Sequence, residues 1–183
     1  MKKFQFIILA ILLFSAPFAN AQRYLTKTGT INFYSKTPME TIDATTKQVT
    51  SALDIAQGDF IFKVQMLSFE FKQALMQEHF NENYVESDKY PNAIFKGKVT
   101  NLKDITLTKN GTYPAIIEGD MTIHNVTNKI KETGTFEVKD GKIIGKAKFK
   151  ISIKSYNVII PALVKDNISD LMEITVDVTL EKQ

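Results

Sequence analysis

The chain of 183 residues contains no cysteine and only two histidines. The absence of cysteine excludes disulfide bonds, thiolate metal sites, cysteine nucleophiles and attachment of a lipid to an N-terminal cysteine. A nucleophile elbow, a phosphate-binding loop and an HExxH zinc motif are also missing. Linkers, low-complexity segments and internal repeats do not occur either. The sequence therefore indicates one domain without an obvious catalytic constellation, held together by its core and its hydrogen bonds.

The first 21 residues have the pattern of a secretory signal peptide. Lys2 and Lys3 form a basic start, residues 6–14 are apolar, and Ala19-Asn20-Ala21 supplies the small residues of a cleavage site before Gln22. The apolar run is short for a membrane span, so an uncleaved anchor is the less favoured alternative. We expect a cleaved signal over residues 1–21 and a periplasmic or secreted domain over residues 22–183, without stable membrane insertion.

Charge argues against a nucleic-acid partner. Removal of the signal peptide takes away two lysines and no acid, which lowers the formal net charge from +3 to +1. The remaining lysines are dispersed at strand spacing and are not clustered with aromatic residues, as a nucleic-acid surface would require.

A period of two dominates the second half of the chain. From Ile143 to Ile153 every second residue is apolar or small, and the residues between are mostly lysine, which places the two sets on opposite faces of a strand. The same alternation occurs at residues 28–34, 60–64, 93–99, 117–123, 130–138 on even numbers and 172–180. Consecutive strands of this kind predict an all-β fold, an antiparallel sheet curled around its apolar side.

The lysines between residues 143 and 154 are expected to lie on the outer face of the sheet. Their parity assigns them to the outer face, where they can pair with acids of another strand and contribute about 0–1 kcal/mol per pair. The lysines concerned are Lys146, Lys148, Lys150 and Lys154, and the acids are Glu173, Asp177 and Glu181.

One short segment has a different period. Apolar residues recur at helical spacing over residues 72–80, which predicts a short helix ending in a turn at 81–83. Before it, residues 67–71 continue the strand pattern on the same face only if a bulge or bend lies near Met66. Residues 41–47 are polar and β-branched, which indicates a weaker strand near a rim or edge.

Turn signals divide the rest of the chain. Asn110-Gly111 and Asp140-Gly141 are typical of tight hairpins, with a hairpin strand expected over residues 104–107. Residues 155–169 are irregular and indicate a loop that crosses one end of the sheet.

Several small residues fall on the inward face, and they allow two interpretations. They can let bent strands close, or they can leave room for a ligand; the two are compatible, because a barrel of about eight strands can hold one small ligand. The residues are Gly97, Gly119, Gly134, Gly145 and Ala147.

Two blocks of sequence resemble the YceI-like family of exported bacterial proteins. In the first, His79-Phe80 follows the short helix and Tyr90-Pro91 precedes an aromatic strand. In the second, residues 118–127, Met121 stands for a family leucine and Asn125 for a turn glycine. The family's histidine-serine strand near the N-terminus is not matched by residues 29–38, which indicates a subgroup.

The resemblance implies an extended, lipocalin-like antiparallel barrel of about eight strands with one short helix at one end. It also implies an interior that holds a long polyisoprenoid chain, such as an isoprenoid quinone-type or prenyl phosphate lipid. The cavity lining expected from the inward face and the helix is Phe60, Phe62, Phe69, Leu75, Met76, Phe80, Phe95, Val99, Met121, Phe136, Phe149, Ile151, Met172 and Ile174. The helix residues of this set are candidates to plug or gate one end, and ordinary core packing is the alternative for each position.

The two histidines are the remaining candidates for chemistry. His79, beside acidic residues at the helix end, has the chemistry of a base or metal ligand, but a lone histidine lacks the partner ligands of a metal site. Capping of the helix for His79 and turn packing for His124 are the favoured interpretations. We therefore expect no catalytic residue, no metal and no cofactor.

The favoured function is non-catalytic binding or transport of an apolar isoprenoid-type lipid. The alternatives are an exported structural or stress-related interaction module with no stable ligand and, less favoured, a hydrolase. A homodimer is the oligomeric form to test.

Overall fold

The computed structural model describes residues 22–183, so the predicted signal peptide lies outside the described residues. The described chain is mostly strand, with one short α-helix, α2, at Ala74–His79. The strands are β1 Arg23–Lys36, β2 Thr41–Asp54, β3 Asp59–Gln65, β4 Glu70–Phe71, β5 Asn92–Val99, β6 Gly111–Ile123, β7 Val126–Lys139, β8 Lys142–Ser152 and β9 Leu171–Lys182.

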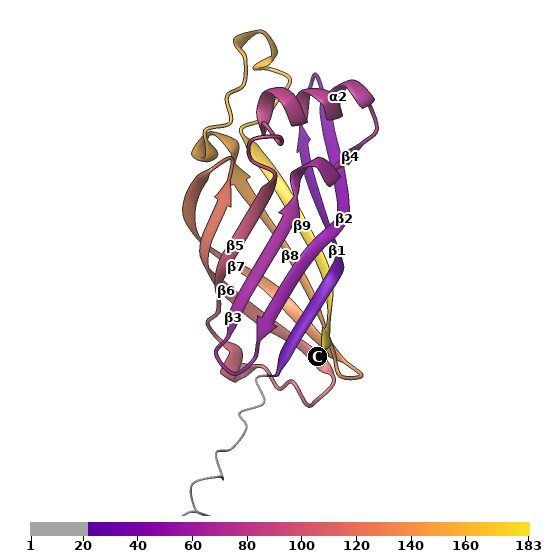
Figure 1. Ribbon diagram of the computed structural model, residues 1–183, viewed down its shortest axis with the longest axis vertical. Helices are drawn as coiled ribbons and strands as arrows, with labels where there is room; N and C mark the ends of the chain where they lie inside the picture. The colour runs from indigo at the N-terminus through magenta and orange to yellow at the C-terminus, as the bar shows by residue number, and fades with distance from the viewer. Residues whose placement is uncertain (1–21) are drawn as a thin grey trace, which may run out of the picture.

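Eight of these strands form a closed antiparallel barrel. They follow the order β1-β9-β8-β7-β6-β5-β3-β2, and β1 pairs with β2 to complete the circle; the two-residue β4 adds to β2. Figure 1 shows α2 and the loop between β8 and β9 at one end, and the chain's C-terminus at the other. We call these the helix end and the packed end. The prediction of an all-β, lipocalin-like barrel with one short helix is confirmed.

The alternation of residues explains the strands. In β8, Ile143 and Gly145 are buried, whereas Lys142, Lys146, Lys148 and Lys150 on the other face are exposed, as expected for a sheet with one apolar face. The outer face carries the predicted lysine–acid pairs in part: Lys148 Nζ lies 2.7 Å from Glu173 Oε1, and Lys146 Nζ lies 3.9 Å from Asp177 Oδ2. Glu181 pairs instead with Lys142, at 2.6 Å.

One of the two predicted hairpin turns is correct. Asp140 and Gly141, with φ of 51° and 78°, join β7 to β8. The prediction for Asn110-Gly111 is wrong, because Gly111 is the first residue of β6. The Asn110 amide instead donates to Asp140 Oδ1 at 3.2 Å, so it holds the neighbouring turn.

The β6–β7 hairpin turns at residues 124 and 125. His124 and Asn125 adopt φ of 49° and 60°, and the left-handed conformation expected for Asn125 is confirmed. The strand predicted over residues 104–107 is wrong: the chain forms a 3₁₀ turn at Leu102–Asp104 and then a loop.

The region around the helix departs from the predicted pattern. α2 begins two residues later than predicted, and the turn expected at 81–83 is a π-helical turn, η2, over Phe80–Tyr84. The bend near Met66 is confirmed as a 3₁₀ turn, Met66–Ser68, which buries Met66 and leaves Leu67 exposed.

The N-terminal strands are longer than the sequence indicated. β2 extends the predicted residues 41–47 to Asp54 and pairs with β1 and β3 as a full barrel strand. The edge position was predicted for residues 41–47 because these first residues of β2 are polar and β-branched.

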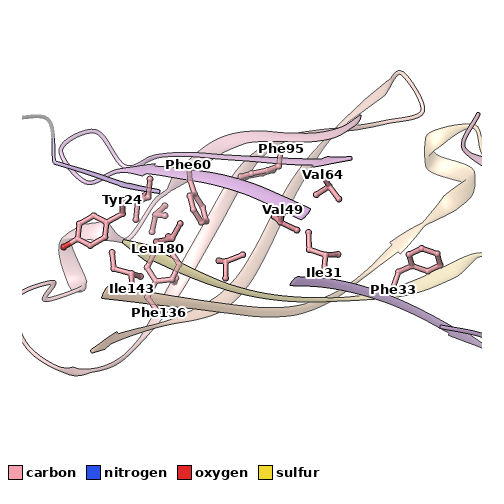
Figure 2. Packing of buried hydrophobic residues seen from close by; sticks show 14 of the residues in the cluster. Tyr24, Ile31, Phe33, Val49, Phe60, Val64, Phe95, Phe136, Ile143 and Leu180 are labelled. Atoms are coloured by element: carbon pink, nitrogen blue, oxygen red, sulfur yellow. The ribbon is translucent and has the colours of Figure 1, made fainter. Parts of the chain in front are cut away.

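The packed end is filled by side chains. Phe60, Phe136 and Leu180 are at most 2% exposed, and Figure 2 shows them gathered with Tyr24 and Ile143 near one end of the barrel. Ile31, Phe33 and Phe95 lie further along the barrel (Figure 2). The interior is therefore solid at one end, and any space lies towards the other.

Glycines allow strands β5 and β6 to approach closely. Gly97 and Gly119 face each other across the pair. A Cβ on Gly97 would collide with the carbonyl oxygen of Glu118, and one on Gly119 with Cα of Gly97. This supports the interpretation of these two glycines as closing residues.

Candidate functional site

An apolar cavity occupies the helix-end part of the barrel. Its volume is about 450 Å³, within the range of roughly 300–1,000 Å³ that is common for small-molecule sites. Phe60 and Phe136 lie at its inner limit, on the packed core. Leu75 of α2 also lines it and is 60% exposed, so the cavity reaches the surface at the helix end.

The structure places all but one of the predicted lining residues on this cavity. They come from β3, β5, β6, β7, β8, β9 and the α2 region. The residues are Phe60, Phe62, Phe69, Leu75, Met76, Phe80, Phe95, Met121, Phe136, Phe149, Ile151, Met172 and Ile174.

Val99 is the exception and does not line the cavity. It is the last residue of β5, 3% exposed, and its N–H donates to the carbonyl of Gly58 at the packed end. Parity alone placed it on the inward face, but parity does not tell how far along the axis the hollow extends.

Some lining residues were missed by sequence reasoning. Ile31 and Phe33 of β1 had the right alternation and were assigned to a strand, but were not carried into the site. Val164 and Ile168 lie in the irregular loop between β8 and β9. No periodic signal marks such loop positions, so they could not have been found from the pattern.

Four phenylalanines form an aromatic cluster at the helix end. Phe80 stacks on Phe33 with ring centroids 5.2 Å apart and meets Phe71 at 5.1 Å and Phe69 at 5.8 Å. All four rings line the cavity. Because Phe80 begins η2 and Phe33 belongs to β1, the cluster attaches the helical segment to the barrel wall by ring packing.

His124 fastens the segment after η2 to the β6–β7 hairpin. Its Nε2 lies 2.9 Å from Glu86 Oε2, its Nδ1 lies 3.2 Å from the carbonyl oxygen of Tyr156, and its ring meets that of Tyr90 edge-on at 4.7 Å. Hydrogen bonds from Lys89 and then from His124 hold the pKa of Glu86 below its usual value. These contacts place His124 in turn packing.

His79 lies at the end of α2 and borders the cavity. Over residues 22–183, no three His, Asp or Glu side chains are grouped in a way that could hold a metal ion. The same residues contain no helix long and apolar enough to cross a bilayer.

Two lining residues carry a carboxyl group: Glu40 in the loop between β1 and β2, and Glu132 in β7. Glu132 belongs to the inward-facing set of β7, between Ile130 and Gly134, and borders the cavity. Burial raises the pKa of this carboxyl group. Its even residue number places it on the inward face of the predicted strand. The predicted cavity lining contained only apolar residues, however, and therefore did not include Glu132.

Solved structures with the same fold are known. A polyisoprenoid-binding domain from Saccharophagus degradans, implicated in plant cell wall breakdown, superposes with a TM-score of 0.77 at 14% identity, covering 88% of this chain and 98% of that one. BcnA of Burkholderia cenocepacia gives a TM-score of 0.67 at 14% identity, covering 83% and 95%. The YceI protein of Campylobacter jejuni gives 0.57 at 18% identity, covering 76% and 85%.

At these identities the structural matches establish the fold. No curated protein matches the chain. The family model described as the YceI-like domain matches residues 24–180, which spans β1 to β9 and all of the cavity wall. The chain therefore belongs to the YceI-like family.

Proposed function

We propose that the protein is an exported, non-catalytic carrier that binds an apolar isoprenoid-type lipid in the barrel cavity. The observation that carries the proposal is the 450 Å³ hollow lined mainly by aliphatic and aromatic side chains and open at the helix end. The likeness to a solved polyisoprenoid-binding domain supports the choice of an isoprenoid chain. The signal-like residues 1–21 support the proposal of export.

Burial of hydrocarbon alone supplies enough free energy. Each buried methylene contributes roughly 0.8 kcal/mol, so about fifteen such groups contribute about 12 kcal/mol, of which about 8 kcal/mol remains after an association cost of about 4 kcal/mol. A dissociation constant of 1 μM corresponds to about 8 kcal/mol. Useful affinity therefore requires a chain that fills the cavity, and it does not require a strong polar contact.

The shape of the wall suits a flexible chain. Met76, Met121 and Met172 line the cavity from α2, β6 and β9, and methionine adapts to an irregular partner because its side chain is unbranched and polarizable. The aromatic rings between them provide flat surfaces that an isoprenoid chain can contact at little cost in side-chain entropy.

Entry requires a movable element, and the helical segment is the candidate. α2 has six residues and no buried residue. It is attached to the wall by the Phe71 N–H, which donates to Gln77 Oε1 at 3.2 Å, and through Phe80 at the start of η2 by the aromatic cluster. In contrast, the barrel strands are joined to one another by backbone ladders. Displacement of Phe80 opens the helix end without breaking a barrel ladder.

A cavity-filling variant tests the site. Met121→Trp places a large ring in the hollow and should weaken binding of a fluorescent isoprenoid at least tenfold. Asp120→Asn is the matched control, because Asp120 is the next residue of β6, is exposed and pairs with Lys129 outside the barrel. Equal affinity in the two variants, with both folded, would place the ligand elsewhere.

A further inference from the structure

Glu132 stands out among the inward positions of β7. The other inward residues from Ile130 to Val138 are apolar or glycine. Glu132 lies opposite Ile117 of β6, whose side chain also lines the cavity. Within residues 22–183, Glu132 makes no hydrogen bond through its side chain and no ion pair, whereas its outward neighbour Lys131 pairs with Glu118 at 2.6 Å.

The backbone leaves room beside this carboxylate. Pairing of β7 with β8 begins at the Asp140-Gly141 turn and ends at Gly134 opposite Ala147, one inward position before Glu132. Gly134 has no side chain, and Phe149 and Ile151 of β8 line the cavity beyond that point. Glu132 is therefore placed where the two strands separate and where a ligand atom can approach it from the cavity.

Among residues 22–183, no lysine, arginine or histidine side chain forms an ion pair with Glu132. Three nearby lysines have acidic partners: Lys129 of β7 pairs with Asp120 at 3.0 Å, and in β8 Lys146 pairs with Asp177 at 3.9 Å and Lys148 with Glu173 at 2.7 Å. Lys146 borders the cavity, but its Nζ is the atom that faces Asp177, and Lys150 of β8 is exposed. An anionic ligand group in the cavity would meet a carboxylate without a counter-ion, in a region of low polarity that strengthens repulsion.

Glu132 is half-buried in an apolar wall, where a hydrogen-bond donor on the ligand stabilises its carboxyl group. We propose that Glu132 determines the ligand's polar group: it binds the hydroxyl of an isoprenoid alcohol within the barrel, and it excludes a phosphate in the same place. The isoprenoid chain then extends from Glu132 past Met121 and Phe95 towards the helix end. This proposal rests on lipid binding in the cavity, and it names the class of lipid.

The raised pKa of Glu132 agrees with the binding of an alcohol. Burial raises the pKa of the Glu132 carboxyl, with no charged neighbour contributing to the shift. A hydroxyl can donate to the ionised form and can accept a hydrogen bond from the protonated form, so an alcohol is accommodated in either state.

Three C20 ligands that differ only in the polar end provide the test: geranylgeraniol, its methyl ether and its monophosphate. They are titrated by competition with a fluorescent lipid into the purified protein and into Glu132→Gln and Glu132→Leu. Glu137→Gln is the matched control, because Glu137 lies on β7 at an outward position. Thermal unfolding of each variant checks that the fold is kept.

The wild type should bind the alcohol at least tenfold more tightly than the monophosphate and several-fold more tightly than the ether. Glu132→Gln should bind the monophosphate at least fivefold more tightly than the wild type does. Glu132→Leu should bind alcohol and ether equally, and Glu137→Gln should behave as the wild type.

Two results would overturn the role of Glu132 but not lipid binding in the cavity. One is wild-type protein that binds the alcohol and the monophosphate equally, and the other is a Glu132→Leu variant that ranks the three ligands by affinity as the wild type does. Failure of the wild type to bind any of the three lipids would overturn lipid binding in the cavity, and the role of Glu132 with it.

Discussion

His124 Nε2 lies 2.9 Å from Glu86 Oε2, and this contact joins the β6–β7 hairpin to the segment that follows the helix. Glu86 also accepts a hydrogen bond from Lys89, three residues further along the chain. The carboxylate thus holds together two elements that border the open end of the cavity.

This arrangement predicts an acid-sensitive contribution to stability. Lys89 and then His124 lower the pKa of Glu86 from its ordinary value of 4.5. A carboxyl group with a lowered pKa in the folded state stabilises the protein above the unfolded-state pKa, and this contribution is lost as the pH falls through the folded-state pKa. Glu86→Gln should therefore lower the melting temperature at pH 6 and have a smaller effect at pH 3.

The control for this experiment is Glu82→Gln, which removes an exposed carboxyl group from η2. Its melting temperature should follow that of the wild type over the same pH range. A pH dependence of Glu86→Gln identical to that of the wild type would show that the contact contributes nothing.

Substitutions at the packed end should mainly lower the stability of the protein, whereas substitutions at the cavity wall should mainly weaken lipid binding. Phe136 is 2% exposed and packs edge-on against Phe60 at the inner limit of the cavity, so Phe136→Ala should cost about 3–5 kcal/mol in free energy of unfolding. Phe149 borders the hollow and is only half-buried, so Phe149→Ala should cost less than about 2 kcal/mol.

For ligand affinity, Phe149→Ala should weaken lipid binding several-fold while the protein stays folded. Chemical denaturation and lipid titration on both variants measure the two effects. A Phe149→Ala variant as unstable as Phe136→Ala would indicate a filled interior at that height.

The Gly97–Gly119 contact predicts a position where one methyl group cannot be tolerated. Gly97→Ala brings a Cβ against the carbonyl oxygen of Glu118, and separation of the strands should cost about 2 kcal/mol or more. At Gly111 the nearest atom to an added Cβ is the Tyr113 hydroxyl at 3.3 Å, the movable end of a side chain. Gly111→Ala should change stability by less than about 0.5 kcal/mol, and equal melting temperatures for the two variants would contradict this account of β5 and β6.

His79 tests the non-catalytic proposal. It lines the cavity at the end of α2, and in a carrier it serves only as part of the wall. His79→Ala should retain lipid binding within about threefold, and the wild type should return the lipid chemically unchanged after prolonged incubation. Turnover in the wild type that disappears in His79→Ala would identify an enzyme.

Strand alternation was the most reliable guide to this fold, because its period of two follows directly from backbone geometry. It placed Met121, Ile151 and Ile174 on the inward face, and these residues line the cavity. The same pattern could not distinguish Val99, in the packed end, from Phe95, on the cavity wall, since both have the same parity in one strand.

Turns were less predictable, because they depend on partners far along the chain. Asn110-Gly111 has the composition of a hairpin turn, but its asparagine holds the Asp140 turn, 30 residues away. In the same way, the sequence of η2 gave no sign of a π-helical turn, since Phe80 is retained there by rings from β1, β4 and the segment before β4.

Extraction of the natively exported protein with organic solvent, followed by mass spectrometry, tests the central claim most directly. The account predicts an isoprenoid lipid that co-purifies in an amount approaching one per protein and that is lost from Met121→Trp. Protein that is consistently empty, and that also takes up no isoprenoid in solution, would contradict it.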